Sequence, residues 1–89
     1  MYNIYAIASI DKKYVYVGLT ANLDQRLARH NKGFEKTTKP YAPFLLIYTE
    51  AAKDRIEARI REKYFKSRSG KRFLYNLLFQ KHPNLTQYH

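Results

Sequence analysis

Two short runs of alternating apolar and polar residues open the chain. In residues 3–10, NIYAIASI, Ile4 and Ala6 share one parity and Tyr5 takes the other, and residues 14–18, YVYVG, alternate in the same way. Alternation with a period of two is typical of strands. Because only the polar residues 11–13 separate the runs, we expect them to pair as an antiparallel hairpin.

Residues 20–33, TANLDQRLARHNKG, change to a helical period. Asn22 is a suitable N-cap, Gln25 follows three residues later as in a capping box, and Gly33 provides the stop signal. The apolar positions of this predicted helix lie one turn apart, at Leu23 and Leu27. It therefore presents one apolar stripe to a core.

The second half of the chain predicts one more strand and two more helices. Residues 34–43 form a basic loop with two prolines, and residues 44–50, FLLIYTE, are a continuous apolar run that we place in the middle of the sheet. Residues 51–66 form a second helix, which Gly70 separates from a third. The third helix has an apolar face made of Phe73, Leu74, Leu77 and Leu78. The expected fold is α+β: a small antiparallel three-stranded sheet flanked by helices, in the order β-β-α-β-α-α.

Length and composition limit the class of protein. A chain of 89 residues is too short for two cores, so we expect a single domain over 1–89 with a core of about 2–78 and a short C-terminal tail, 79–89. It has no cysteine, and no apolar run approaches the roughly 18 residues of a membrane span. The N-terminus lacks the features of a secretion signal. These features suit a cytoplasmic protein and no membrane partner.

The charge indicates the partner. Lys and Arg number 17 against 7 Asp and Glu, a formal net charge of +10. Such an excess repels itself in the compact state, and its usual use is to bind a polyanion, since neutralised phosphates release counterions. Nucleic acid is the first expectation. An incidentally basic, solvated surface is the alternative.

Three polar residues occupy unusual helical positions. Arg26 and His30 are four residues apart, so they project side by side, and His30 falls near the Leu stripe. In the second helix Glu62 stands between Ala58 and Phe65, where a carboxylate is costly to desolvate without a cation or metal. His30 also fits a hydrogen-bonded core-edge histidine. Glu62 equally fits a salt bridge to Arg59 or Lys66.

Taken together, these segments resemble the GIY-YIG nuclease family. The resemblance rests on IYAI, YVG after a short hairpin, NLDQRLARHNKG, ARIREKYFK and an asparagine in the third helix, and it covers residues 2 to about 78. Asn3 replaces the glycine of the family's first signature. Carried onto this sequence, the family's site residues are Tyr5, Tyr16, Arg26, His30, Glu62 and Asn76, with Asn84 as a weaker match for the asparagine.

The resemblance implies a divalent-metal-dependent endonuclease. Glu62 would hold one Mg²⁺ (or Mn²⁺) with water and phosphate oxygens, as a hard cation prefers. Arg26 would clamp the phosphate, and Tyr5 would take the proton of the attacking water if Arg26, Lys12, Lys13 or the metal favour its phenolate. His30 and Tyr16 stand as alternative groups for orienting or relaying that water.

The substrate expected from the resemblance and the charge is DNA, with RNA not excluded. The lysines expected to contact nucleic acid are Lys12, Lys13, Lys32, Lys36, Lys39 and Lys66. No appended sequence reader is visible, so we expect little sequence specificity, or reliance on DNA structure or a protein partner, in a role such as DNA repair or recombination.

Two other classes stay open. A non-catalytic nucleic-acid-binding module on the same fold would use the lysine-rich loop and aromatics such as Phe34 and Tyr41. Against it stands Glu62, because a carboxylate at a phosphate site is repulsive unless a metal lies between them. A protein-interaction domain would show no salt-dependent affinity for nucleic acid.

Overall fold

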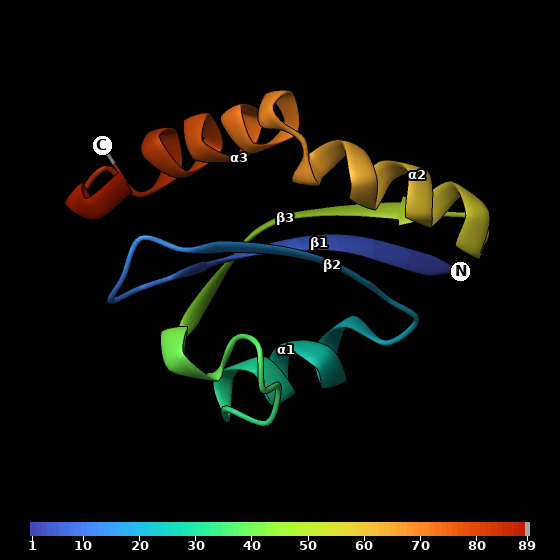
Figure 1. Ribbon diagram of the computed structural model, residues 1–89, viewed down its shortest axis with the longest axis horizontal. Coiled ribbons are helices and arrows are strands. Elements are labelled where there is room, and N and C mark those ends of the chain that lie inside the picture. The colour runs from blue at the N-terminus through green and yellow to red at the C-terminus, as the bar shows by residue number, and fades with distance from the viewer. Residues whose placement is uncertain (89) are drawn as a thin grey trace.

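The computed structural model describes residues 1–88 and shows a three-layered α+β fold (Figure 1). A three-stranded antiparallel sheet in the order β2-β1-β3 forms the middle layer, α1 covers one face, and α2 and α3 cover the other. The predicted fold class and element order are confirmed. The elements are β1 (Tyr2–Ser9), β2 (Val15–Thr20), α1 (Leu23–Asn31), η1 (Lys39–Tyr41), β3 (Phe44–Ala52), α2 (Arg55–Lys66), α3 (Arg68–Lys81) and η2 (Thr86–Tyr88).

The alternation in β1 separates two cores. Ile4, Ala6 and their parity partners pack toward α2 and α3. Tyr5 and Ile7 point to the opposite face, where α1 packs. All residues from Ile4 to Ser9 are buried, because β1 has a strand on each edge and helices on each face.

The position of β3 differs from the sequence prediction. We expected residues 44–50 in the middle of the sheet, but β1 is central and β3 is an edge strand that extends to Ala52. Its Leu46 is 42% exposed, so one face of the apolar run is only partly covered. A register shift opposite Ala6 and Ile7 gives β3 one extra residue. An apolar run shows that a strand can be buried on both faces, but it does not give the order of the strands. Here β3 pairs with the free edge of β1, which makes β1 the central strand.

The first helix begins and ends where the sequence signals lie. The Asn22 side chain accepts a hydrogen bond from the Gln25 backbone N–H at 3.2 Å. Gly33 has a φ of 76°, a left-handed conformation that favours glycine. Thus the predicted cap and stop of α1 are both present.

The second and third helices need two corrections. α2 begins at Arg55 rather than residue 51, because the Asp54 side chain caps it by accepting from the Glu57 N–H at 2.8 Å. Gly70 does not break the helices: Ser67 caps α3, and Gly70 lies inside its first turn. A Cβ on Gly70 would overlap the backbone of Tyr64 and Phe65. This glycine therefore allows the two helices to approach closely.

Some apolar residues of α2 and α3 lie on the solvent side of these helices and not in the core. Leu74 and Leu78 are fully buried under α3, whereas Phe73 is 42% exposed. On α2, the row formed by Ile56 and Ile60 faces away from the sheet. None of the helices within residues 1–88 combines the length and the apolar character that a membrane crossing demands.

Residues after α3 pack on the β1–β2 turn. Tyr88 is buried, and its hydroxyl donates to the Ser9 carbonyl at 2.6 Å and accepts from the Tyr14 N–H at 3.2 Å. The Gln87 side-chain amide donates to the Ile10 carbonyl at 2.7 Å. The C-terminal segment therefore holds the turn in place.

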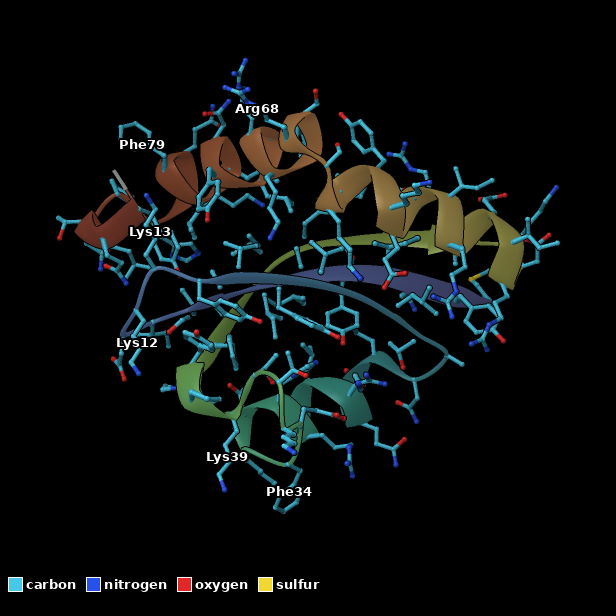
Figure 2. The ribbon with its side chains drawn as sticks, in the orientation of Figure 1. Lys12, Lys13, Phe34, Lys39, Arg68 and Phe79 are labelled. Atoms are coloured by element: carbon cyan, nitrogen blue, oxygen red, sulfur yellow. The ribbon has the colours of Figure 1, made fainter. Side chains whose placement is uncertain are left out.

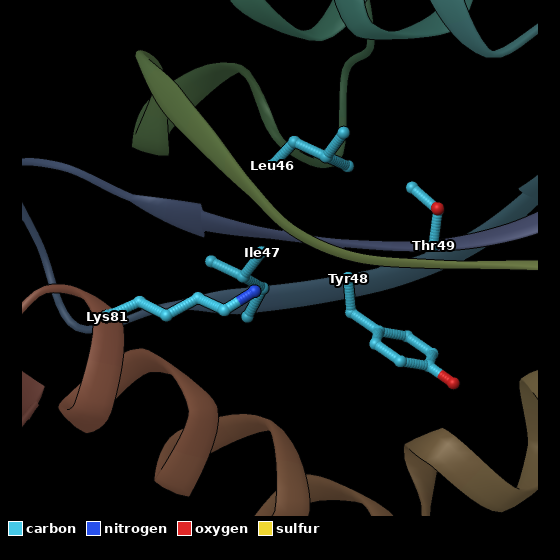
Figure 3. Close-up of a pocket in the computed structure, with 5 residues that line it drawn as sticks. All are labelled: Leu46, Ile47, Tyr48, Thr49 and Lys81. Carbon is cyan, nitrogen blue, oxygen red and sulfur yellow. The ribbon is translucent and has the colours of Figure 1, made fainter.

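A cavity of about 340 Å³ lies along β3 (Figure 3). It is lined by Leu46, Ile47, Tyr48, Thr49 and Lys81. It contains one charged group and none of the site residues expected from the sequence. Tyr5, Tyr16, Arg26 and His30 lie on the α1 face of the sheet, whereas Glu62 and Asn76 lie on the helices of the other layer.

Candidate active site

Tyr5 and Gly18 form the base of the candidate site. They are cross-strand partners on β1 and β2, and Tyr5 is fully buried. An ideal Cβ on Gly18 would lie 2.6 Å from Tyr5 Oη and 3.0 Å from a ring carbon of Tyr16. The glycine of YVG therefore leaves the space that the Tyr5 ring occupies.

A chain of buried hydrogen bonds starts at Tyr5. Tyr5 Oη lies 2.8 Å from His30 Nε2, and His30 Nδ1 lies 2.8 Å from Thr38 Oγ1. The Thr38 hydroxyl donates to the Glu35 carbonyl over a long 3.5 Å. We assign the His30 tautomer from this network: Nδ1–H donates to Thr38, which leaves Nε2 to accept from the Tyr5 hydroxyl.

The electrostatics support a neutral histidine. Burial lowers the pKa of His30, and the positive charges of Arg26 and Arg29 lower it further, against the opposing effect of Glu35. A neutral imidazole has a free lone pair on Nε2. His30 Nε2 is thus a hydrogen-bond acceptor for the Tyr5 hydroxyl.

The neighbouring cations do not give Tyr5 the lowered pKa that the role of base would require of them. Burial is the largest effect and raises the pKa of the phenol, Tyr16 adds to it, and the lowering by Arg26 does not compensate. Lys12 and Lys13 lie elsewhere, with their ammonium groups near the rings of Tyr41 and Tyr75. Tyr5 therefore rests as a neutral phenol.

Tyr16 and Tyr14 share a sheet face but differ in their neighbours. The Tyr16 ring centroid lies 6.2 Å from that of Tyr5 and 5.1 Å from that of His30. Tyr14 instead stacks on Tyr41, with centroids 3.8 Å apart and planes at 8°. Tyr16 therefore borders the hydrogen-bond chain, and Tyr14 lies outside it.

Arg26 is held next to this chain by Glu35. Its Nε is 3.3 Å from Glu35 Oε1, which also lies 2.9 Å from Arg29 Nε. Within residues 1–88 Arg26 Nε is buried and has no partner with hydrogen-bond geometry. The hydrogen bond from Arg29 lowers the pKa of Glu35. Arg26 thus keeps donor capacity for an incoming anion.

Glu62 lies on α2, in the opposite layer from His30. Its side chain is 13% exposed and pairs with Lys66 at 3.3 Å and Arg59 at 3.7 Å. Both salt bridges that the sequence left as the alternative reading are therefore present. Its charge is the smallest of the effects that raise the pKa of Tyr5, after burial, Tyr16 and Glu35.

The other predicted site residues are more dispersed. Lys32, Lys36 and Lys39 are exposed around the loop that follows α1, whereas Lys66 is engaged with Glu62. Asn76 is exposed, two residues from each of the buried Leu74 and Leu78, which places it on the outer side of α3. Asn84 is also exposed. The roles expected for these residues stay predictions.

Sequence reasoning missed two residues of this site. Thr38 is fully buried against His30, yet nothing in its spacing distinguishes it from Thr37. Glu35 had a usable signal, because it is the only acidic residue between positions 25 and 49. A lone carboxylate among cations has a high chance of pairing with them.

A metal ion would find its ligands among the acidic and histidine side chains. No three His, Cys, Asp or Glu residues gather as a metal site in the part of the chain that the structure describes. A cation that takes one carboxylate and completes its shell with water and phosphate does not need such a cluster. Glu62, a hard oxygen donor with partial access to solvent, fits that kind of site.

Comparison with known proteins gives matches along most of the chain. Residues 1–76 match the model of the GIY-YIG catalytic domain. The UPF0213 protein DP2720 of Desulfotalea psychrophila is 35% identical over 60 residues, covering 65% of this chain and 54% of that protein. The UPF0213 protein in ldhD 5'region of Pediococcus acidilactici is 40% identical over 60 residues, covering 64% of this chain and 61% of that protein. The match thus spans a little over half the length of these relatives. No solved structure matches the chain significantly.

Proposed function

This chain belongs to the GIY-YIG family, and we propose that it is a divalent-metal-dependent endonuclease that hydrolyses DNA phosphodiester bonds with little intrinsic sequence specificity. We also propose that residues 1–89 act as one domain. The observation that carries the proposal is the buried chain from Tyr5 through His30 to Thr38. Hydrolysis takes a proton from the attacking water, and the neutral His30 at the end of the Tyr5 hydrogen bond offers that proton an acceptor.

The proposed step moves one proton along this chain. Water attacks the phosphorus and gives a proton to Tyr5 Oη, while the Tyr5 hydroxyl proton passes to His30 Nε2 over the existing 2.8 Å hydrogen bond. The leaving strand oxygen takes its proton from solvent. Since the pKa of Tyr5 is raised, Tyr5 works as a relay and His30 is the final base. Thr38 is a positioning residue that holds the tautomer.

Arg26 is proposed to bind the phosphate. Its guanidinium is fixed beside Glu35 by an ion pair, and its buried Nε has no partner with hydrogen-bond geometry among residues 1–88. Negative charge grows on the non-bridging oxygens during attack, and a permanently charged donor placed there stabilises the transition state without titrating. Glu35 would keep Arg26 oriented before DNA arrives.

Glu62 is the residue proposed to hold Mg²⁺ or Mn²⁺. When bound, such an ion supplies Lewis-acid stabilisation of the leaving oxygen. The Glu62 carboxylate would hold the ion as a hard oxygen ligand, and its salt bridges to Lys66 and Arg59 support a position that accommodates positive charge. Release of Lys66 would leave that ammonium free for a DNA phosphate.

The exposed lysines are proposed to supply affinity without reading sequence. Lys32, Lys36 and Lys39 are long cations on the surface of the α1 layer, and contacts of this kind bind phosphates in any sequence. Specificity would then come from DNA structure or from a protein partner.

Incubation with supercoiled plasmid tests the function. We expect nicked and then linear DNA with Mg²⁺ and unchanged plasmid with EDTA. His30→Ala protein should bind plasmid in EDTA as the unmodified protein does but fail to nick it, while Gln25→Ala, a control at an exposed position of the same helix, should still nick. The unmodified protein could instead bind plasmid tightly and in a salt-dependent way but nick it with neither Mg²⁺ nor Mn²⁺. That result would establish the non-catalytic binding module.

A further inference from the structure

Phe34 is an anomaly on the α1 layer. Its side chain is 63% exposed, and within residues 21–43, all of which the structure describes, it is the only large apolar side chain with such exposure. Figure 2 shows its ring projecting away from the sheet, with Lys39 extending on the same side. A hydrophobic protein interface needs several contiguous apolar groups. A single ring among charges does not provide one.

The backbone that carries Phe34 is firmly held. Its N–H donates to the Arg29 carbonyl at 2.9 Å, and the preceding Gly33 N–H donates to the His30 carbonyl at 3.1 Å. Gly33 adopts a φ of 76°, which turns the chain outward from the end of α1. Since this turn is fixed by hydrogen bonds, the ring is presented at little further cost in ordering.

The surroundings of the ring are cationic. The Arg29 guanidinium lies 6.0 Å from its centroid. Residues 26–39 contain five Lys and Arg against one Glu, and that Glu35 is engaged by Arg26 and Arg29. A flat aromatic surface surrounded by cations is complementary to a nucleotide, whose base stacks while its phosphate is neutralised.

Glu35 connects the ring to the proposed phosphate clamp. It follows Phe34 directly in sequence, and its carboxylate contacts Arg26. The same carboxylate contacts Arg29, whose guanidinium lies near the Phe34 ring, so a strand whose phosphate is held at Arg26 has a base-stacking surface beside the same ion-pair cluster. Bases inside a duplex are already stacked on both faces, so only an unpaired base is available to this ring.

We propose that Phe34 is a stacking site for an unpaired base, which directs the nuclease to DNA that contains a single-stranded segment next to a duplex. This deepens, and rests on, the proposed DNA-cleaving function. The ligand is a nucleobase in a gap, flap or overhang, with its backbone on the cations of residues 26–39.

The test uses two DNA probes in EDTA, so that binding is measured without cleavage. One is a duplex with a short gap that carries the fluorescent base 2-aminopurine, and the other is a fully paired duplex of the same length. We expect the protein to quench 2-aminopurine by stacking and to prefer the gapped duplex. Phe34→Leu should abolish the quenching and weaken binding to the gapped duplex roughly tenfold, with a much smaller effect on the paired duplex. Phe34→Trp should retain both properties.

Tyr64→Leu is the matched control. Tyr64 is also an exposed ring with an arginine, Arg61, 5.1 Å from its centroid, but it lies on α2. This variant should quench and bind as the unmodified protein does. Quenching that survives in Phe34→Leu, or an equal loss of affinity for both probes, would overturn the proposal.

The plasmid assay separates this inference from the proposed function. Nicking by the unmodified protein without quenching in the gapped probe would refute the stacking site alone. Quenching that depends on Phe34 without any nicking would support the stacking site and refute catalysis.

Discussion

Replacing Gly18 with alanine tests whether the Tyr5 ring needs the space above β2. The new Cβ would lie 2.6 Å from Tyr5 Oη and 2.8 Å from Cζ, closer than ordinary contacts allow. Gly18 does not have a positive φ, so backbone strain does not contribute. The result depends on the side chains alone.

The magnitude comes from two opposing effects. Alanine is more favourable than glycine inside a strand by roughly 0.5–1 kcal/mol. Overpacking of a buried position costs about 1–3 kcal/mol, and Tyr5 is fully buried and bound to His30 at 2.8 Å, so it cannot move away freely. We therefore expect a net destabilisation of about 0.5–2 kcal/mol, together with displacement of the phenol from His30.

Chemical denaturation and plasmid nicking measure the two consequences. Gly18→Ala should lower the free energy of unfolding and slow single-turnover cleavage, and its cost in stability should shrink in a Tyr5→Phe background, where the closest atom is gone. Gly33→Ala is a different control, because its cost arises from a φ of 76° and should not depend on residue 5. A Gly18→Ala protein that is more stable and fully active would refute the packing argument.

Three further predictions concern the proposed site. Tyr5→Phe should slow single-turnover cleavage by roughly a hundredfold or more without changing DNA affinity in EDTA, while Tyr14→Phe should stay active. A fully active Tyr5→Phe protein would rule out the Tyr5 relay and leave His30 to take the proton from water directly. Glu62→Gln should lose Mg²⁺-dependent cleavage and keep DNA binding, whereas Glu57→Gln on the same helix should keep both cleavage and binding. Equal activity of the two variants would remove the metal assignment. The pKa of His30 in the folded protein lies below its ordinary value of 6.5. As the pH falls, the unfolded chain therefore takes up the histidine proton before the folded protein does. The stability contributed by neutral His30 is fully present above pH 6.5 and is lost as the pH falls through the folded pKa. Urea titrations at falling pH should show this loss in the unmodified protein and not in His30→Gln, and cleavage should fall in the same range.

The sequence alone predicted those elements whose start or end depends on residues only a few positions away. The hairpin, the Asn22 cap and the end of α1 at Gly33 follow from turn residues and side-chain-to-backbone hydrogen bonds within a few positions. Asp54 with Glu57 three residues later was an equally local signal for the start of α2, and the apolar run before it obscured that signal.

Parity also determined which tyrosines share a face. Tyr14 and Tyr16 have the same parity in their strand, whereas the pairing of Tyr5 with Tyr16 in one site came from the family resemblance; the rings of Tyr5 and Tyr16 lie 6.2 Å apart. The i, i+4 spacing of Arg26 and His30 similarly placed both on one helix surface. The periodicity of a strand or helix determines from which side of that element each side chain projects, whatever the rest of the fold is.

Contacts between distant segments were decided by tertiary structure alone. The edge position of β3 depended on which side of the hairpin stayed free, and the partner of His30 Nδ1 turned out to be Thr38, in a loop with no periodic signal. The raised pKa of Tyr5 has the same origin, since burial under α1 outweighs the cations that the sequence places nearby. Desolvation depends on everything that packs around a group, so no count of neighbouring charges along the chain predicts it.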